Sequence, residues 1–236
     1  SYWYVKMLDK WEPSVKYSRL FLEIPAAGQQ AKVFVNGEFV VSHEGGYSAF
    51  RADITEKCTE EFNTIAIWCS NEKCDAIYPQ SADFTFYGGL YRGAHLICVP
   101  ETHFELLHYG DLGIHAATEP ASWDKENFML HIRTKICGVE KDNQVIYQIF
   151  DEDGKEVASA TRPADSPDTS IPLYKPHRWD IKNSYQYMLK ALIMRNNECL
   201  DEVELKFGVR TFCCDPGRGF LINGNCVPLR GVTRTR

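Results

Sequence analysis

The sequence predicts an all-β protein of two domains, a jelly-roll β-sandwich followed by an immunoglobulin-like β-sandwich. Short runs of alternating apolar and polar residues recur along the 236 residues, whereas the 3.6-residue repeat of an amphipathic helix is hard to find. Asn-Gly and Gly-Gly pairs, which favour tight turns, separate several of these runs. Folded domains cluster near roughly 100–150 residues, so the length fits two of them.

The first domain is expected to span residues 1–111. Its strands are predicted from alternation and β-propensity at 19–24, 31–35, 38–41, 64–69, 95–99 and 103–107. Asn36-Gly37 predicts a hairpin turn between the second and third of these strands, because both residues tolerate positive φ. A long connection at 70–93 contains Gly88 and Gly89. Connections of this length are commonly functional, so this loop is the most informative feature of the first domain.

The second domain is expected to span residues 112–211. Its strands are predicted near 128–133, 145–150, 156–157, 185–193 and 202–207, and the proline-rich stretch 162–176 is expected to be an irregular edge or loop. About seven strands in roughly a hundred residues fits an immunoglobulin-like sandwich. No Cys…Trp…Cys core pattern is present, which disfavours an antibody-type domain.

Residues 212–236 are expected to be a linker and the start of a further domain. An apolar run at 220–222 ends in Asn223-Gly224, which predicts a hairpin whose returning strand is 227–232. A hairpin and a basic strand end this close to the last residue suggest entry into a domain that is absent.

Composition gives no reason to expect nucleic acid or a membrane as a partner. The net charge is −6 and the pI is about 5.7, and no stretch approaches the ~20 apolar residues of a membrane span. The first residues lack the basic and apolar regions of a signal peptide. We expect a cytoplasmic protein, with a periplasmic or secreted one left open because the native N-terminus can be missing.

The nine cysteines are expected to be reduced and structural. Their number is odd, their spacing is irregular and there is no C-x-x-C motif. The seven histidines show no spacing typical of a tetrahedral metal site, and no phosphate-binding loop, nucleophile elbow or dinucleotide fingerprint occurs. We therefore expect no metal and no cofactor in this chain.

The pattern "FGVRTF…DPGRGFLINGNCVPLRGVTR" resembles the segment that joins the β-sandwich domain of family 2 glycoside hydrolases to their catalytic (β/α)8 barrel. Within the family it is most similar to the β-galactosidases. The resemblance implies a non-catalytic accessory region of a retaining enzyme that hydrolyses terminal β-galactosides, with the barrel missing. It also implies a β-galactoside or oligosaccharide partner through the full-length enzyme, a homo-oligomeric parent, and sodium or magnesium as the parent's ions.

Three residues are candidate substrate-binding residues through this resemblance. "DFTFYGGLYR" is similar to the family segment whose aspartate reaches over the barrel to the substrate, and Asp83 holds the matching position. Taken alone, an acidic loop residue among aromatics is more often a solvated residue beside core aromatics. Arg230 and Arg234 match family arginines close to the active site. Trp179 lies in a run that resembles the family's domain-anchoring segment, without a catalytic role.

No catalytic residue is expected in this chain. Retaining hydrolysis needs two carboxylates about 5–5.5 Å apart on rigid supports, and in the family both are glutamates on barrel strands. The Asn-Glu pairs at 71–72 and 197–198 are turn-like and lack that context. The chain alone is therefore expected to be inactive. Alternatives are a free-standing carbohydrate-binding module, a β-glucuronidase or β-mannosidase parent, and a structural adhesion-type domain pair.

Overall fold

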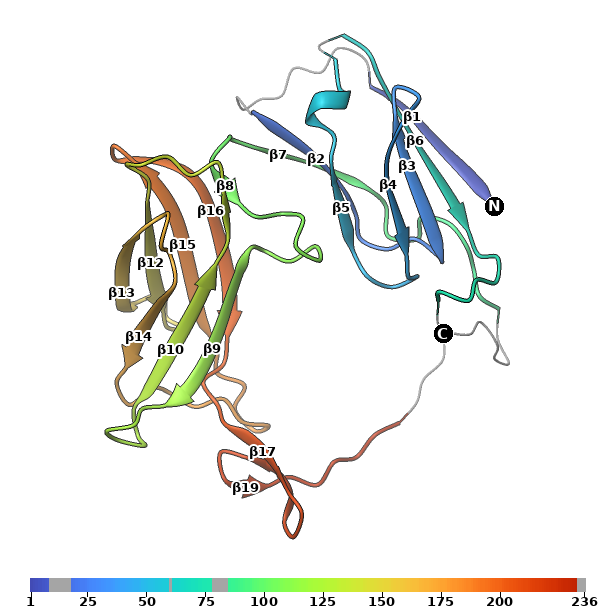
Figure 1. The fold of residues 1–236 in the computed structure, drawn as a ribbon. Coiled ribbons are helices and arrows are strands. Elements are labelled where there is room, and N and C mark those ends of the chain that lie inside the picture. The colour runs from blue at the N-terminus through green and yellow to red at the C-terminus, as the bar shows by residue number, and fades with distance from the viewer. Residues whose placement is uncertain (9–17, 60, 78–84, 233–236) are drawn as a thin grey trace. The chain divides into compact units, whose positions relative to one another are not determined.

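The computed structural model describes residues 1–8, 18–59, 61–77 and 85–232 (Figure 1). Contacts divide the chain into two compact units, Ser1–Glu101 with Leu106–Asp111 and Thr102–Glu105 with Leu112–Arg236. Regular structure in the described residues consists of nineteen strands and one short 3₁₀ helix, which confirms the expected all-β class. None of the described helices has the length and apolar character needed to cross a membrane.

The first unit is a sandwich of two antiparallel sheets. One sheet has the order β1-β6-β3-β4 and the other has the order β5-β2-β7. The bounds are β1 Tyr2–Leu8, β2 Arg19–Ile24, β3 Gln30–Val35, β4 Glu38–Glu44, β5 Phe50–Asp53, the 3₁₀ helix Thr55–Lys57, β6 Asn63–Ser70 and β7 His95–Val99. Alternate side chains of β2, β3 and β6 point inward and form the core, as the predicted period of two requires.

Strand β1 is an edge strand of the first unit. It pairs only with β6, in the register Tyr2↔Cys69 to Leu8↔Asn63. Its residues are exposed except for the half-buried Leu8. On one face of its sheet, Trp3 contacts Phe34 with ring centroids 5.6 Å apart.

The second unit has the layered pattern expected for an immunoglobulin-like sandwich. A three-stranded sheet of order β14-β10-β9 and a four-stranded sheet of order β13-β12-β15-β16 enclose one core (Figure 1). Their bounds are β9 Ile114–Pro120, β10 Phe128–Thr134, β12 Gln144–Phe150, β13 Glu156–Pro163, β14 Thr169–Leu173, β15 Tyr187–Arg195 and β16 Glu198–Phe207. Two small sheets accompany them, formed by β8 His103–Phe104 with β11 Ile136–Cys137, and by β17 Phe212–Asp215, β18 Gly219–Ile222 and β19 Asn225–Cys226.

A buried tyrosine links the two layers of the second unit. Tyr147 on β12 is fully buried, and its hydroxyl lies 2.7 Å from the Thr134 hydroxyl on β10 and donates to the Pro167 carbonyl at 2.9 Å. Burial raises the pKa of Tyr147 to about 12, with the hydrogen bond to Thr134 acting in the opposite direction. The Tyr147 hydroxyl therefore stays protonated, and its two hydrogen bonds hold it in place inside the core.

At two places, prolines account for a difference between the expected and the observed strands. The returning strand after Asn223-Gly224 is Asn225–Cys226, and residues 227–232 form no strand, since Pro228 has no N–H to continue the ladder. Within the stretch expected to be irregular, Thr169–Leu173 is a strand that contains Pro172. The sheet order places it at an edge, where a proline is tolerated.

The cysteines agree with the expected reduced state. All nine are described and all nine are free, with Cys69 buried and four at exposed positions. Burial raises the pKa of the Cys69 thiol to about 11, so this side chain behaves as a small apolar group of the core.

Candidate functional site

The candidate site is the loop after β6, which the sequence singled out. Asp83 lies outside the described residues, as does Arg234, so the roles expected for them stay predictions. The described part of the loop, residues 85–92, immediately follows Asp83's segment and shows how the loop is attached to the first unit.

The loop is held by backbone hydrogen bonds to the segment that leads into β3. Gly28 and Gly89 exchange two of them, with N···O distances of 3.0 and 3.1 Å. A Cβ atom on Gly28 would lie 2.8 Å from the carbonyl oxygen of Tyr87, and Gly89 has a φ of +91°. Both positions need glycine, because a side chain at either would push the two backbones apart or strain the loop.

Hydrogen bonds to three further segments, two of them through side chains and one through a backbone carbonyl, hold the same loop. Asn71, after β6, donates from Nδ2 to the Phe86 carbonyl at 3.0 Å. The Tyr4 hydroxyl on β1 accepts a hydrogen bond from the Leu90 amide at 3.3 Å. Tyr91 donates from its hydroxyl to the carbonyl of Gly46 at 2.5 Å. Residues 85–91 are thus attached to the framework at both ends and in the middle.

A buried amide lies beside these attachments. Gln29 is 4% exposed, and its backbone donates to the Ser70 carbonyl and accepts from the Gly45 amide. Its side-chain amide packs against Gly46, where an added Cβ would lie 2.8 Å from Oε1. Within the described residues the structure records no hydrogen bond of this side-chain amide. Gln29 is therefore a buried polar residue of the loop's surroundings, which sequence patterns did not reveal.

The turn between β4 and β5 completes the surroundings of the loop. Residues 45–50, GGYSAF, contain this turn, and β5 begins at Phe50. The His43 ring stacks on the Phe50 ring at 4.3 Å, and its Nε2 lies 3.1 Å from the Ser48 hydroxyl. Burial lowers the pKa of His43, so this ring is neutral at neutral pH.

A second attachment fixes the segment after β8 to the first unit. The Arg51 guanidinium on β5 is 7% exposed and pairs with the Glu23 carboxylate on β2 at 2.7 Å. The same group donates to the carbonyls of Leu106 at 3.1 Å and Asp111 at 2.5 Å. One buried charge therefore ties residues 106–111 to the second and fifth strands.

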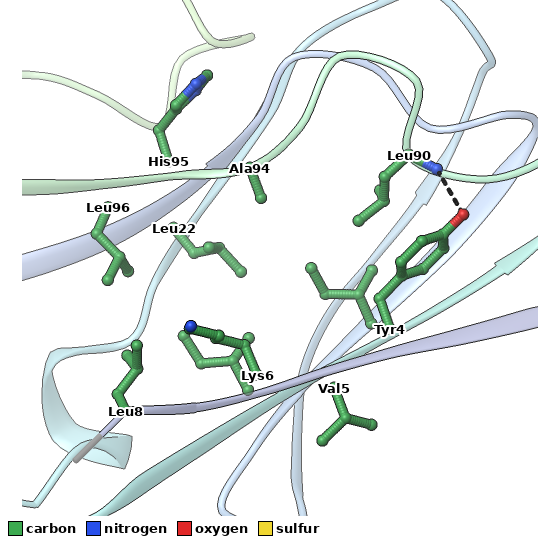
Figure 2. Close-up of a pocket in the computed structure, with 11 residues that line it drawn as sticks. Tyr4, Val5, Lys6, Leu8, Leu22, Leu90, Ala94, His95 and Leu96 are labelled. Carbon is green, nitrogen blue, oxygen red and sulfur yellow. Dashed lines mark hydrogen bonds between the residues drawn. The ribbon is translucent and has the colours of Figure 1, made fainter.

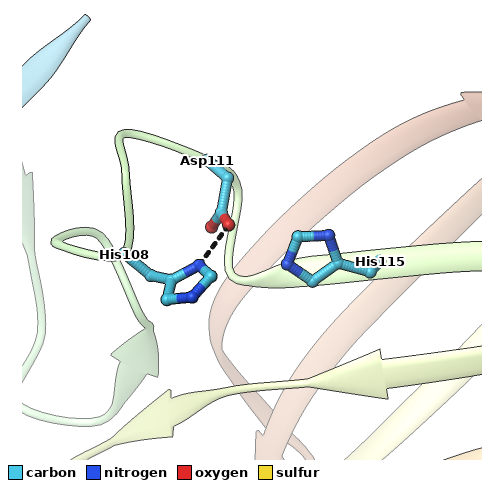
Figure 3. Close-up of side chains that lie close together, drawn as sticks. All are labelled: His108, Asp111 and His115. Carbon is cyan, nitrogen blue, oxygen red and sulfur yellow. Dashed lines mark hydrogen bonds and ion pairs between the residues drawn. The ribbon is translucent and has the colours of Figure 1, made fainter.

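Within this tied segment, His108 and Asp111 form a close pair. Their Nδ1 and Oδ2 atoms are 2.6 Å apart, and both side chains are half-buried (Figure 3). His115, also drawn there, belongs to the second unit. Two ligands are fewer than the three or four protein ligands of a zinc site, so the pair by itself is described as a hydrogen-bonded pair.

Around Trp179, the second unit anchors the segment that leads to the chain's last described residues. The Trp179 amide donates to the Val209 carbonyl at 2.9 Å, and the Arg210 guanidinium lies over the indole ring at 4.8 Å. Asn223 donates from Nδ2 to the Trp179 carbonyl and accepts from the Thr211 amide, both at 3.0 Å. The β18–β19 turn is therefore attached to the sandwich. Beyond it, Arg230 is exposed in an irregular segment and stays a predicted substrate-binding residue.

Comparison with known proteins identifies the architecture. Residues 119–210 match the family model described as Glycosyl hydrolases family 2. The resemblance to glycoside hydrolase family 2 is thereby confirmed. A solved structure described as an FMN-binding β-glucuronidase from Facaelibacterium prausnitzii L2-6 superimposes with a TM-score of 0.91 at 41% identity, covering 98% of this chain and 36% of that one.

Relatives named for two different activities align with this chain. A β-glucuronidase of Bacteroides fragilis is 30% identical over 233 residues, covering 94% of this chain and 33% of its own length. A β-galactosidase of Thermoanaerobacter pseudethanolicus is 28% identical over 241 residues, covering 98% of this chain and 31% of its own length. The chain therefore spans about a third of the length of these relatives.

Proposed function

We propose that this chain is the non-catalytic accessory region of a retaining β-glycosidase of family 2. The observation that carries the proposal is the set of attachments that hold residues 85–91 to four separate segments of the first unit. A loop held in this way can contribute a fixed wall to a substrate pocket, and Asp83, which lies outside the described residues, is proposed to contact the substrate. Fixed positioning matters because a misplacement of about 1 Å can cost a hundredfold in rate.

The proposed substrates are β-glucuronides. The relative with 41% identity over nearly the whole chain is described as a β-glucuronidase, and so is the Bacteroides fragilis relative. The β-galactosides expected from the sequence are the second candidate, supported by the Thermoanaerobacter relative. A β-mannoside substrate has no such support among these relatives.

The proposed roles of this chain and of the missing catalytic residues follow from how a retaining glycosidase works. Two carboxylates about 5–5.5 Å apart form and hydrolyse a covalent glycosyl-enzyme intermediate. We assign both to residues outside this chain. Asp83, Arg230 and Arg234 are proposed to contact the sugar or its surroundings, where an arginine can pair with a carboxylate substituent through two hydrogen bonds. A homo-oligomeric parent that uses sodium or magnesium remains part of the proposal.

Activity assays test the proposal directly. The purified 236-residue chain and the longest protein encoded by the same reading frame are assayed with nitrophenyl β-glucuronide and nitrophenyl β-galactoside. We expect no turnover by the chain, turnover by the longer protein, and a higher kcat/KM for the glucuronide. Turnover by the chain alone would contradict the accessory role, and preference for the galactoside would restore the second candidate.

A titration separates an accessory region from a free-standing sugar-binding module. Glucuronate and galactose are added to the isotope-labelled chain and followed by NMR. Saturable shifts confined to strands of the first unit would favour the module, whereas absent or weak shifts near residues 85–91 favour the accessory region. Because that loop belongs to a larger pocket in the proposal, its isolated affinity is expected to be low.

A further inference from the structure

An apolar cavity opens in the first unit, between strands β1 and β6 of one sheet and β2 and β7 of the other (Figure 2). Its volume is about 510 Å³, within the ~300–1,000 Å³ of typical small-molecule sites. Packed protein interiors rarely leave voids much larger than a water molecule. A space of this size between two sheets is therefore suited to an occupant. The lining is mostly aliphatic, formed by Leu8, Leu22, Ile65, Ile67, Leu90 and Leu96.

One cationic group enters this aliphatic space. Tyr4, Lys6 and Leu8 lie on the same side of β1, and Figure 2 shows the Lys6 side chain among the lining groups, below Leu22. The structure records no carboxylate among the described residues that pairs with Lys6. His95, the other basic residue of the lining, points away from the space in the same view. Its Nδ1 lies 3.7 Å from the Glu23 carboxylate.

The ends of the cavity define the shape of its occupant. Tyr4 closes one end, where its hydroxyl accepts the hydrogen bond from Leu90. Among the described lining residues, Tyr4 alone is a phenylalanine, tyrosine or tryptophan, so they offer few stacking surfaces to a flat aromatic ligand. An aliphatic body therefore fits the walls better than an aromatic one. The charge of Lys6 adds a preference for an anionic end group.

We propose that this cavity binds a single-chain aliphatic carboxylate, with its chain between the two sheets and its carboxylate on the Lys6 amine. The site is distinct from the loop at residues 85–91 and does not depend on glycosidase activity. Two consequences follow for the affinity of such ligands. Each added methylene is expected to tighten binding about fourfold until the cavity is full. Replacing the carboxylate by an alcohol is expected to weaken binding.

Calorimetric titration of the intact chain with hexanoate, octanoate, decanoate and decanol, below their micelle concentrations, tests the proposal. Lys6→Met keeps a long apolar side chain but removes the charge, so decanoate affinity should fall about tenfold while decanol affinity stays. Lys32→Met is the matched control. Lys32 is an exposed lysine of the same sheet that lies over the Trp68 ring, and its replacement should change neither affinity.

A blocking variant provides the second arm. Figure 2 shows the Ala94 methyl group directed toward the space between Leu22 and Leu90, so Ala94→Trp should obstruct this part of the cavity and weaken the binding of both ligands. The exposed loop position of Ala94 limits the effect on folding, which circular dichroism checks. The absence of saturable binding, or decanoate binding that survives both Lys6→Met and Ala94→Trp, would overturn the proposal. Decanol binding equal to that of decanoate would overturn the assignment of Lys6.

Discussion

Replacement of Arg51 by Met is expected to destabilise the first unit strongly. The guanidinium is almost fully buried and satisfies the Glu23 carboxylate and two backbone carbonyls, those of Leu106 and Asp111. Methionine fills a similar volume but leaves a largely buried carboxylate without its counter-charge. Breaking a buried ion pair from one side typically costs about 3–5 kcal/mol. Glu23 keeps 20% exposure, so water can relieve part of this cost and we expect about 3 kcal/mol.

Two measurements check this value and its location. Urea denaturation gives the loss of unfolding free energy, about a hundredfold change in the folding equilibrium of the first unit. Hydrogen exchange followed by mass spectrometry should show that residues 106–111 lose protection, because their carbonyl contacts disappear.

A paired control distinguishes burial from charge alone. Arg19 pairs with Asp53 at 2.6 Å, but its side chain is 31% exposed, so Arg19→Met should cost about 1 kcal/mol or less. If Arg51→Met is no more destabilising than Arg19→Met, or leaves the exchange at residues 106–111 unchanged, the proposed role of the buried charge is wrong.

Four further predictions concern single side chains. In the longer protein, Tyr91→Phe removes a hydrogen bond of the loop and should lower kcat/KM about five- to tenfold, whereas Tyr47→Phe at an exposed position should not. Asn223→Ala removes two hydrogen bonds and leaves a non-glycine residue at positive φ, so exchange in β18 and β19 should rise about tenfold or more. Tyr147→Phe should cost about 1–3 kcal/mol in urea unfolding, because the Thr134 hydroxyl loses its buried partner. Burial raises the pKa of Asp201 despite hydrogen bonds from two backbone amides, so the folded state holds this proton more tightly than the unfolded chain. Unfolding free energy should therefore fall as pH rises from the ordinary 3.8 through the raised value, and Asp201→Asn should remove that slope.

Local patterns predicted those strands whose alternation is regular. The run at 19–24 matches β2, and Asn36-Gly37 joins β3 to β4 as expected. Strand β1 was missed because its residues, YWYVKML, are largely apolar on both faces and show no alternation. That lack of alternation has a structural cause. One side of β1 borders the aliphatic cavity, and the other carries Trp3 against Phe34.

The candidate site was predictable only in its position along the chain. The long connection and its Gly-Gly pair indicated a special loop, but nothing local indicated its partners. Gly28, Gly46 and Tyr4 come from three other parts of the sequence, and two of them contribute only backbone atoms. Backbone hydrogen bonds leave no residue-type pattern beyond the glycines they need. The attachment of the loop therefore required the tertiary structure.

The same attachments explain how one scaffold can serve enzymes of different specificity. Relatives named β-glucuronidase and β-galactosidase align with nearly the whole chain at 30% and 28% identity, so similar sandwiches occur in proteins named for two different sugars. The two hydrogen bonds between Gly28 and Gly89 hold the loop through backbone atoms alone, which do not depend on the other side chains of the loop. Side chains elsewhere on the loop can therefore change without loosening it. A glucuronide carries a carboxylate where a galactoside carries a hydroxymethyl group. Discrimination between the two must then come from protein groups that touch this substituent, because a charged partner compensates the desolvation of a carboxylate. In the proposed accessory role, the framework positions such groups and their chemistry decides which sugar is accepted.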